Sequence, residues 1–171
     1  HHLLLKLNVA NVTLHSMMSQ SGRISSLSDF KNSRVRILIA TDVAGRGLDI
    51  PDVDLVINYD IPKRAEDYIH RVGRTARAGR TGRALSLITQ HDVSLIHNIE
   101  AHMDMQIEKS EEVKDDDVVP LLNTVAKASR LAQLAMVENG FDEKNEMRGE
   151  RKKAARKEKR RKEKRLKKAA K

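Results

Sequence analysis

Residues 37–51 read ILIATDVAGRGLDIP, and this stretch decides the fold. It begins with an apolar run that enters a polar turn, which predicts a short buried strand. The loop that follows is rich in glycine and contains Arg46 and Asp49. In open α/β sheets, ligands bind in the loops that leave the carboxyl ends of the strands. In such a loop an aspartate can accept hydrogen bonds from ribose hydroxyls, and Thr41 with nearby backbone N–H groups can hold phosphate oxygens.

Outside this stretch, expected strands and helices alternate along the chain. A helical segment can place Ile24, Leu27 and Phe30 on one buried face. Alternation predicts βαβ units, so the expected fold class is α/β with a parallel sheet flanked by helices. Aromatic residues are few, so Phe30, Tyr59 and Tyr68 are expected in the core or at a hinge. The expected strands are residues 8–14, 35–40, 54–58 and 84–88, and the expected helices are 3–7, 20–31, 65–72 and 93–103.

A second informative stretch, residues 69–77, reads IHRVGRTAR. Arg71, Arg74 and Arg77 stand at i, i+3 and i+6, so a helical turn would place them on one face. Guanidinium groups stay charged and pair bidentately with phosphate, so this face is suited to a polyphosphate. Gly73 would leave room for a ligand or a second backbone. Taken alone, an arginine-rich stretch is more often a solvated basic helix end.

Three sequence signatures occur in order: QSGR at residues 20–23, ATDVAGRGLDIP at 40–51 and HRVGRTAR at 70–77. They resemble the Q-x-x-R element and motifs V and VI of DEAD-box RNA helicases. Each motif alone is a weak signal, whereas the three in this order make a strong match. The resemblance covers roughly residues 1–105 and implies the second of the two RecA-like domains of a helicase core.

The resemblance implies which residues would take part in ATP binding and hydrolysis. Arg74 and Arg77 would contact the β- and γ-phosphates, and Arg77 would be the arginine finger. A guanidinium delivered to the transferring phosphoryl group can raise the rate by about 10³- to 10⁵-fold. Asp49 would bind the ribose, Gly47 would allow close approach, and Arg46 would bridge to the partner domain.

The resemblance also implies an RNA site. Gln20, Gly22, Arg23 and Thr41 match family positions that hold the sugar-phosphate backbone, which positions a strand without reading its sequence. His70 would couple the nucleotide site to the RNA site through the other domain. Without the resemblance, His70 would be a helix-capping or core histidine, and Arg23 an ordinary exposed residue.

Several parts of a complete helicase are missing from this sequence. The chain starts after the position of motif IV, contains no G-x-x-x-x-G-K-[ST] loop and lacks the first RecA-like domain. Asp115–Asp117 follow polar sequence, so they are assigned to a solvated linker and helix N-cap and not to a DEAD box. Gly45 and Ala76 replace residues that are usual in the family, but both are small. The chain alone is expected to be inactive, with ATP as cofactor, Mg²⁺ held mainly by the missing domain and no metal site of its own.

The last third of the chain differs from the first part. Residues 106–141 are expected to form a linker and an amphipathic helix at 118–137. Residues 142–171 form a basic tail with 16 of the 33 Lys and Arg and 6 of the 24 Asp and Glu, so the tail has a net charge of +10 and the rest −1. The tail is either an isolated helix or disordered. The apolar face of the helix, which must pack on something, contains Leu121, Leu122, Val125, Leu131, Leu134 and Ala135.

Composition excludes several classes of protein. The chain of 171 residues contains no cysteine, so it has no disulfide framework. Its longest apolar runs are far too short to cross a bilayer, and no secretory signal pattern is present. We expect a monomer without membrane contact. Because the sequence does not begin with methionine, we expect it to start inside a longer protein.

Short matches point to a biological setting. HSMM at residues 15–18 and FDEK at 141–144 resemble the eukaryotic DEAD-box subgroup that acts in small-subunit ribosome assembly, which implies rRNA or pre-rRNA as partner and a nuclear, nucleolar location. Basic clusters in the tail suit a nuclear targeting signal or a plain solubilising tail.

One alternative function is that of a DNA-directed superfamily 2 helicase, in which motif VI more often begins with glutamine. The other is a non-catalytic nucleic-acid-binding module in which the tail supplies the affinity.

Overall fold

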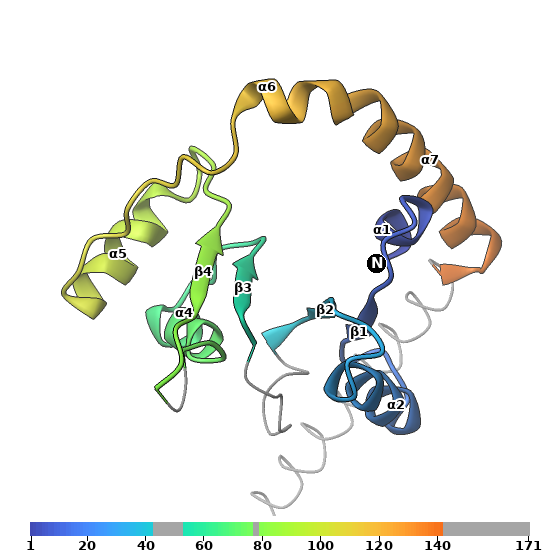
Figure 1. Cartoon of the computed structure of the whole chain (residues 1–171), viewed down its shortest axis with the longest axis horizontal. Coiled ribbons are helices and arrows are strands. Elements are labelled where there is room, and N and C mark those ends of the chain that lie inside the picture. Colours follow the sequence, from blue (N-terminus) through green and yellow to red (C-terminus); the bar gives the residue numbers. More distant parts are fainter. Residues whose placement is uncertain (43–52, 77–78, 142–171) are drawn as a thin grey trace, which may run out of the picture. The chain divides into compact units, whose positions relative to one another are not determined.

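The computed structural model describes residues 1–42, 53–76 and 79–141, which fall into two compact units. One unit contains His1 and Ala10–Leu121. The other contains His2–Val9 and the chain from Leu122 onward. Figure 1 shows the elements of both units in sequence colours.

The first unit contains two parallel strand pairs, each joined by a helix. β1 (Val12–Leu14) pairs with β2 (Leu38–Ala40), and α2 (Gln20–Lys31) connects them. β3 (Leu55–Asn58) pairs with β4 (Arg83–Ser86), and α4 (Ala65–Val72) connects them. The register places Val12 opposite Leu38 and Leu55 opposite Arg83. These βαβ units confirm the predicted α/β class with parallel strands flanked by helices (Figure 1).

Three helices have the bounds that the sequence predicts. They are α2, α4 (Ala65–Val72) and α5 (Val93–Met103). α2 begins at a serine N-cap, Ser19, whose side chain accepts a hydrogen bond from a backbone N–H of the first turn. α4 ends at Val72, and Gly73 is its C-cap. Local periodicity and capping residues thus set these limits correctly.

The strands are shorter than predicted or shifted. β1 begins at Val12 instead of residue 8 because Asn8, with a φ of 58°, terminates the preceding helix. β2 begins at Leu38 instead of residue 35 because the N–H of Arg34 bonds to the carbonyl of Asp29 in α2 (2.9 Å). β4 starts and ends earlier than the predicted 84–88.

The apolar core of the first unit lies between α4 and α5. It contains Ile61, Ala65 and Tyr68 from the β3–α4 side and Ile96 and Ile99 from α5. Ile99 is 1% exposed and Tyr68 is 5% exposed. Tyr68 therefore confirms the prediction of a core aromatic residue, and its packing fixes α4, the helix that leads into the arginine motif.

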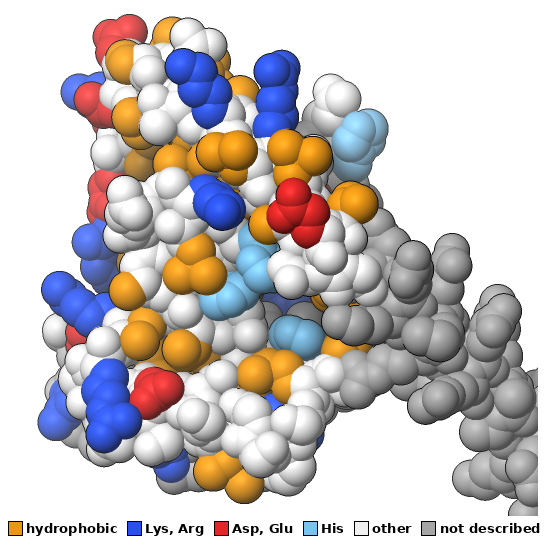
Figure 2. Space-filling model, turned by 90° about the vertical axis from the view of Figure 1, so that its right-hand side faces the viewer, with side chains coloured by type: hydrophobic (Ala, Val, Ile, Leu, Met, Phe, Trp, Pro, Cys, Tyr) orange, Lys and Arg blue, Asp and Glu red, His pale blue; other side chains and the backbone are white. Residues whose placement is uncertain are grey.

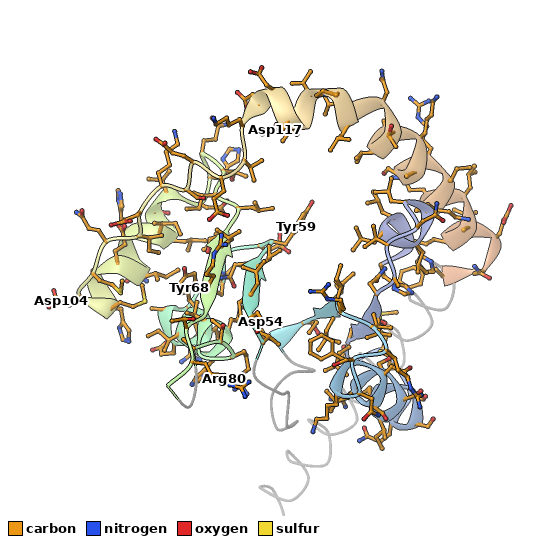
Figure 3. All side chains as sticks on the ribbon, viewed as in Figure 1. Asp54, Tyr59, Tyr68, Arg80, Asp104 and Asp117 are labelled. Atoms are coloured by element: carbon orange, nitrogen blue, oxygen red, sulfur yellow. The ribbon has the colours of Figure 1, made fainter. Side chains whose placement is uncertain are left out.

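Other predicted burial is wrong. Tyr59, expected in the core or at a hinge, is 77% exposed and projects from the end of β3 (Figure 3). Ile24 in α2 is 59% exposed, and Ile57 in the supposedly buried β3 is 58% exposed. Sequence periodicity marks which residues can share a face, whereas exposure depends on which elements cover that face.

The helix predicted at residues 118–137 is interrupted. The structure has α6 (Asp115–Val118), a 3₁₀ turn at Val119–Leu121 and then α7 (Leu122–Glu138). Pro120 lies in the 3₁₀ turn, and proline cannot donate the backbone hydrogen bond that a continuous helix needs. Asp115–Asp117 form the first turn of α6, where carboxylates favour the positive end of the helix dipole, while Lys114 occupies the N-cap.

In the second unit, α1 (His2–Lys6) lies against α7. The buried residues of α7 are Ala128 and Ala132, whose small side chains let the two helices approach closely. The predicted apolar face is mostly exposed, a correction to the sequence analysis: Leu122 is 58% and Leu134 59% exposed. Hydrophobic side chains interspersed with charged ones are also visible in Figure 2. Within the described residues, no helix is long and apolar enough to span a membrane.

Candidate functional site

The predicted RNA contacts lie at one edge of the β1–β2 pair. Thr41 follows β2 directly, and its backbone N–H donates to the carbonyl of Leu14 at the end of β1 (3.1 Å). The turn into α2 leaves β1 at the same edge because the two strands are parallel. Thr41 is exposed. The structure therefore brings Thr41 and the start of α2 to the edge where α/β sheets bind ligands.

The start of α2 is organised by local hydrogen bonds. The N–H of Gly22 donates to Ser19 Oγ (3.1 Å), and the N–H of Arg23 donates to the Ser19 carbonyl (3.0 Å). Arg23 Nη1 donates to Gln20 Oε1 (3.3 Å). A Cβ atom at Gly22 would lie 3.2 Å from Ser19 Oγ, so a larger residue would crowd the cap. Gln20, Gly22 and Arg23 thus form one compact helix start, whose backbone dipole favours an anion such as phosphate.

Arg71 forms an ion pair that joins α4 to the end of β2. Its Nε and Nη2 donate to the two carboxylate oxygens of Asp42 at 2.6 and 2.7 Å. Its Nη1 donates to the Asp60 carbonyl (2.7 Å) and to Asn58 Oδ1 (3.3 Å). The Arg71 and Asp42 side chains are 25% and 34% exposed. This bidentate, partly buried arrangement holds the residue after Thr41 against the last turn of α4.

A buried polar network continues from Arg71. Asn58 is 1% exposed, and its Nδ2 donates to Ser86 Oγ (3.3 Å) across the β3–β4 pair. The Tyr68 hydroxyl lies 3.2 Å from the same Ser86 Oγ. Sequence analysis missed Asn58 and Ser86, since no local pattern marks them. Asp42 had a usable signal, because it follows Thr41 directly in the motif.

Arg71 and Arg74 of the second motif do not share one helical face, and Arg77 lies outside the described residues. α4 ends at Val72, and the N–H of Arg74 closes a turn onto the Arg71 carbonyl (3.0 Å). Arg71 points to Asp42 instead of an open surface, because a carboxylate from a distant segment neutralises it. Because α4 ends at Val72, Arg74 lies beyond the helix, and the predicted shared face is wrong for Arg71 and Arg74.

Arg74 is half-buried, and its Nε donates to the carbonyl of His70 (3.3 Å). Within the described part of the chain, its terminal guanidinium nitrogens have no hydrogen-bond partner, so they are available to a ligand. His70 itself is exposed in the last turn of α4. Four other predicted site residues, Arg46, Gly47, Asp49 and Arg77, lie outside the described residues.

Near the start of α4, the pKa of one carboxyl is shifted. Hydrogen bonding from the backbone N–H of Glu66, together with the Arg64 side chain, holds the pKa of the Glu66 carboxyl below its ordinary value. No group of three His, Asp or Glu residues in the described ranges is arranged to hold a metal ion. The guanidinium group of Arg74 and the backbone N–H groups at the start of α2 are donors suited to phosphate.

Residues 1–79 match the family described as Helicase conserved C-terminal domain. The chain is 54% identical over 139 residues to DEAD-box ATP-dependent RNA helicase 36 of Arabidopsis thaliana, covering 81% of this chain and 28% of the relative. It is 47% identical over 149 residues to ATP-dependent RNA helicase dbp8 of Schizosaccharomyces pombe, covering 87% and 32%. The chain thus spans about a third of the length of these curated relatives.

Solved structures of the DEAD-box protein Dbp5 have the same fold. Its C-terminal domain is 30% identical to this chain with a TM-score of 0.60, covering 71% of this chain and 72% of that one. Dbp5 of Saccharomyces cerevisiae bound to RNA and ADP BeF3 is 32% identical with a TM-score of 0.58, covering 73% and 33%. The ordered motifs, the parallel βαβ units and these similarities show that the chain belongs to the DEAD-box RNA helicase family and contains its RecA-like C-terminal helicase domain.

Proposed function

We propose that this domain is the second lobe of an ATP-dependent RNA helicase that unwinds short RNA duplexes locally. The observation that carries the proposal is the Asp42–Arg71 ion pair (2.6 and 2.7 Å). It joins the residue after Thr41, a candidate RNA contact, to a helix end that leads directly into Arg74, a candidate phosphate contact. A domain that must respond to RNA and ATP together needs such a connection between the two sites.

On the ATP side, Arg74 and Arg77 are the groups we assign to the β- and γ-phosphates, with Arg77 as arginine finger. Negative charge spreads over the transferring phosphoryl oxygens, and guanidinium groups positioned there stabilise the transition state. The terminal nitrogens of Arg74, which have no hydrogen-bond partner among the described residues, fit this role. Asp49 would hold the ribose, Gly47 would allow the nucleotide to approach, and Arg46 and His70 would contact the first lobe.

ATP would bind mainly to a first RecA-like lobe, which would also hold its Mg²⁺. The second lobe closes on that lobe when ATP and RNA are both bound, so neither lobe alone forms the complete site. Isolated, the present chain is expected to hydrolyse no ATP.

On the RNA side, Thr41 and the start of α2 would hold the sugar-phosphate backbone, through Gln20, Gly22 and Arg23. They offer hydroxyl, amide, guanidinium and backbone N–H groups, which contact phosphate and 2′-hydroxyls but do not read bases. Dbp5 has been solved with RNA and a nucleotide analogue, which supports an RNA contact for a domain of this fold.

We assign rRNA or pre-rRNA as the substrate and the nucleolus as the location. The HSMM and FDEK segments, which resemble the DEAD-box subgroup that acts in small-subunit ribosome assembly, support this assignment. Imaging of the tagged full-length protein tests the location, and exclusive cytosolic signal would contradict it.

The decisive experiment is ATP hydrolysis by the full-length gene product with and without nucleic acid. We expect strong stimulation by single-stranded RNA and little by DNA of the same sequence. Equal stimulation by DNA would favour the DNA-directed superfamily 2 alternative. No stimulation by either, with nucleic-acid binding intact, would favour the non-catalytic binding module.

A tail deletion separates the helicase from the binding module more sharply. Removing residues 144–171 should weaken RNA binding and flatten its dependence on salt, because the basic side chains there displace counterions from phosphates. RNA-stimulated ATPase activity at saturating RNA should survive the deletion if the helicase assignment holds.

A further inference from the structure

One buried hydroxyl fastens the segment after α4 to the start of β3. Thr75 is 5% exposed, and its Oγ1 donates to the carbonyl of Val53 at 2.5 Å, with the carbonyl of Asp54 at 3.3 Å. In return, the N–H of Val53 donates to the carbonyl of Arg74 (3.0 Å). Arg74 and Thr75 are therefore tied to the same strand start by two hydrogen bonds in opposite directions.

The other side of Thr75 is closed by Gly82. A Cβ atom at position 82 would collide with Thr75 Oγ1 and with the backbone N of Ala76, so only glycine fits there. The next residue, Arg83, is anchored as well, because its N–H donates to the carbonyl of Asp54 (3.1 Å). Thr75 thus lies between two backbone segments and cannot shift without breaking a hydrogen bond or meeting a backbone atom.

The residue after Thr75 has an unusual conformation. Ala76 has a φ of 56°, in the left-handed region that residues with a Cβ rarely adopt. Such a conformation persists only where the surrounding structure enforces it. The Thr75 hydrogen bond and the close approach of Gly82 are the restraints that lie next to it.

We propose that Thr75 is a positioning residue for ATP hydrolysis: its hydroxyl, enclosed by Val53 and Gly82, sets the place of Arg74. This inference rests on the proposed function, in which Arg74 contacts phosphate. The physical reason is that a displacement of about 1 Å in a group that contacts the transition state can cost about 100-fold in rate. Thr75 itself is buried and touches no substrate.

The test measures kcat and the KM for ATP of the full-length protein at saturating RNA. The RNA affinity of the same protein is measured by titration with RNA. Thr75→Val keeps the side-chain shape and removes the donor. We expect kcat to fall by about 10- to 100-fold, with KM and RNA affinity within about twofold of wild type. Thr75→Ser keeps the hydroxyl and should restore kcat to within about threefold of wild type.

Two controls separate positioning from general stability. Thr89→Val removes an exposed threonine hydroxyl that bonds to Asp92 (2.6 Å) and should leave kcat unchanged. Thermal melting shows whether each variant is folded at the assay temperature. If Thr75→Val is unfolded there, Thr75→Ala, which adds no bulk, is measured with the same expectation.

The outcomes are distinguishable. If the wild type has RNA-stimulated ATPase activity and folded Thr75→Val is equally active, this inference is overturned while the proposed function stands. Equal losses in Thr75→Ser and Thr75→Val would also overturn it, because the hydroxyl would then not be the deciding group. A wild type without RNA-stimulated ATPase activity would overturn the proposed function, and this inference with it.

Discussion

The end of α4 and the start of α2 contain the candidate phosphate and RNA contacts, and they are stabilised differently. At the end of α4, Arg71 bonds to Asp42 and Thr75 to Val53, partners that lie 29 and 22 positions away in the sequence. At the start of α2, the N–H of Gly22 bonds to Ser19 Oγ, three positions away.

This difference matches the two tasks. A guanidinium group that meets a transferring phosphoryl group must be held in one place, which requires long-range partners. Groups that follow a flexible RNA backbone need only local support, because the strand itself adapts. We therefore expect changes near the end of α4 to affect turnover and stability, and changes near the start of α2 to affect RNA affinity.

The largest expected effect comes from the arginine finger. Arg77→Lys in the full-length protein should lower kcat by about 10³-fold or more, because lysine is a point charge that does not match the geometry of phosphate. RNA affinity should not change. Arg80→Lys, an exposed arginine nearby, is the matched control and should keep wild-type turnover. Equal losses of kcat in the two variants would contradict the assignment of Arg77 as the arginine finger.

The next effect concerns folding stability. Arg71→Met should lower the free energy of unfolding by about 1.5–3 kcal/mol, because it leaves partly buried acceptors without a charged donor. Arg34→Met breaks the ion pair with Asp29 at the end of α2, where the arginine side chain is 71% exposed, and should cost less than about 1 kcal/mol. Urea denaturation of the chain measures both. A similar cost for the two variants would contradict the contrast between the two regions.

A smaller effect is expected at the helix cap. Ser19→Ala removes the acceptor of the Gly22 N–H and should lower stability by about 1 kcal/mol. RNA affinity should fall because Gly22 and Arg23 lose their fixed place, whereas kcat at saturating RNA should not change. Ser25→Ala, at an exposed position of the same helix, is the control and should leave RNA affinity unchanged. A drop in kcat for Ser19→Ala would contradict the proposal that the start of α2 affects RNA affinity and not turnover.

The smallest effect is a pH dependence at the start of α4. The pKa of Glu66 is lowered in the folded chain, so its stabilising contribution is present above the ordinary value of 4.5 and is lost as the pH falls through the lower folded value. Glu66→Gln should therefore lower stability slightly at neutral pH and not at strongly acidic pH. Thermal melting of both proteins across this range measures the difference. A constant difference at all pH values would contradict the assignment.

The sequence predicted helices better than strands and burial. The bounds of α2, α4 and α5 were correct because caps and apolar periodicity are local signals. The strands came out shorter, since Asn8 ends one helix in a left-handed conformation and Arg34 bonds back to another. Exposure of Ile57 and Tyr59 could not be predicted, because it depends on which elements cover each face.

In the candidate site, too, the predictions came from local sequence signals, and tertiary contacts were not predicted. The roles of Gln20, Gly22, Arg23, Thr41 and Arg74 were predicted from motifs, and they stay predictions. Arg71 was predicted wrongly, because its spacing to Arg74 indicated a shared face while its true partner is Asp42. Thr75 and Asn58 were missed, since a threonine and an asparagine in a sequence give no sign of being buried.

By itself, the sequence determined the α/β class, the order of the three motifs and the residue types that favour phosphate. These properties are fixed within short segments by periodicity, capping and side-chain chemistry. Only the tertiary structure decided that Arg71 pairs with Asp42 and that Thr75 is enclosed by Val53 and Gly82. Such pairings join segments that are distant in the chain, and they form only when packing brings their polar groups together away from water.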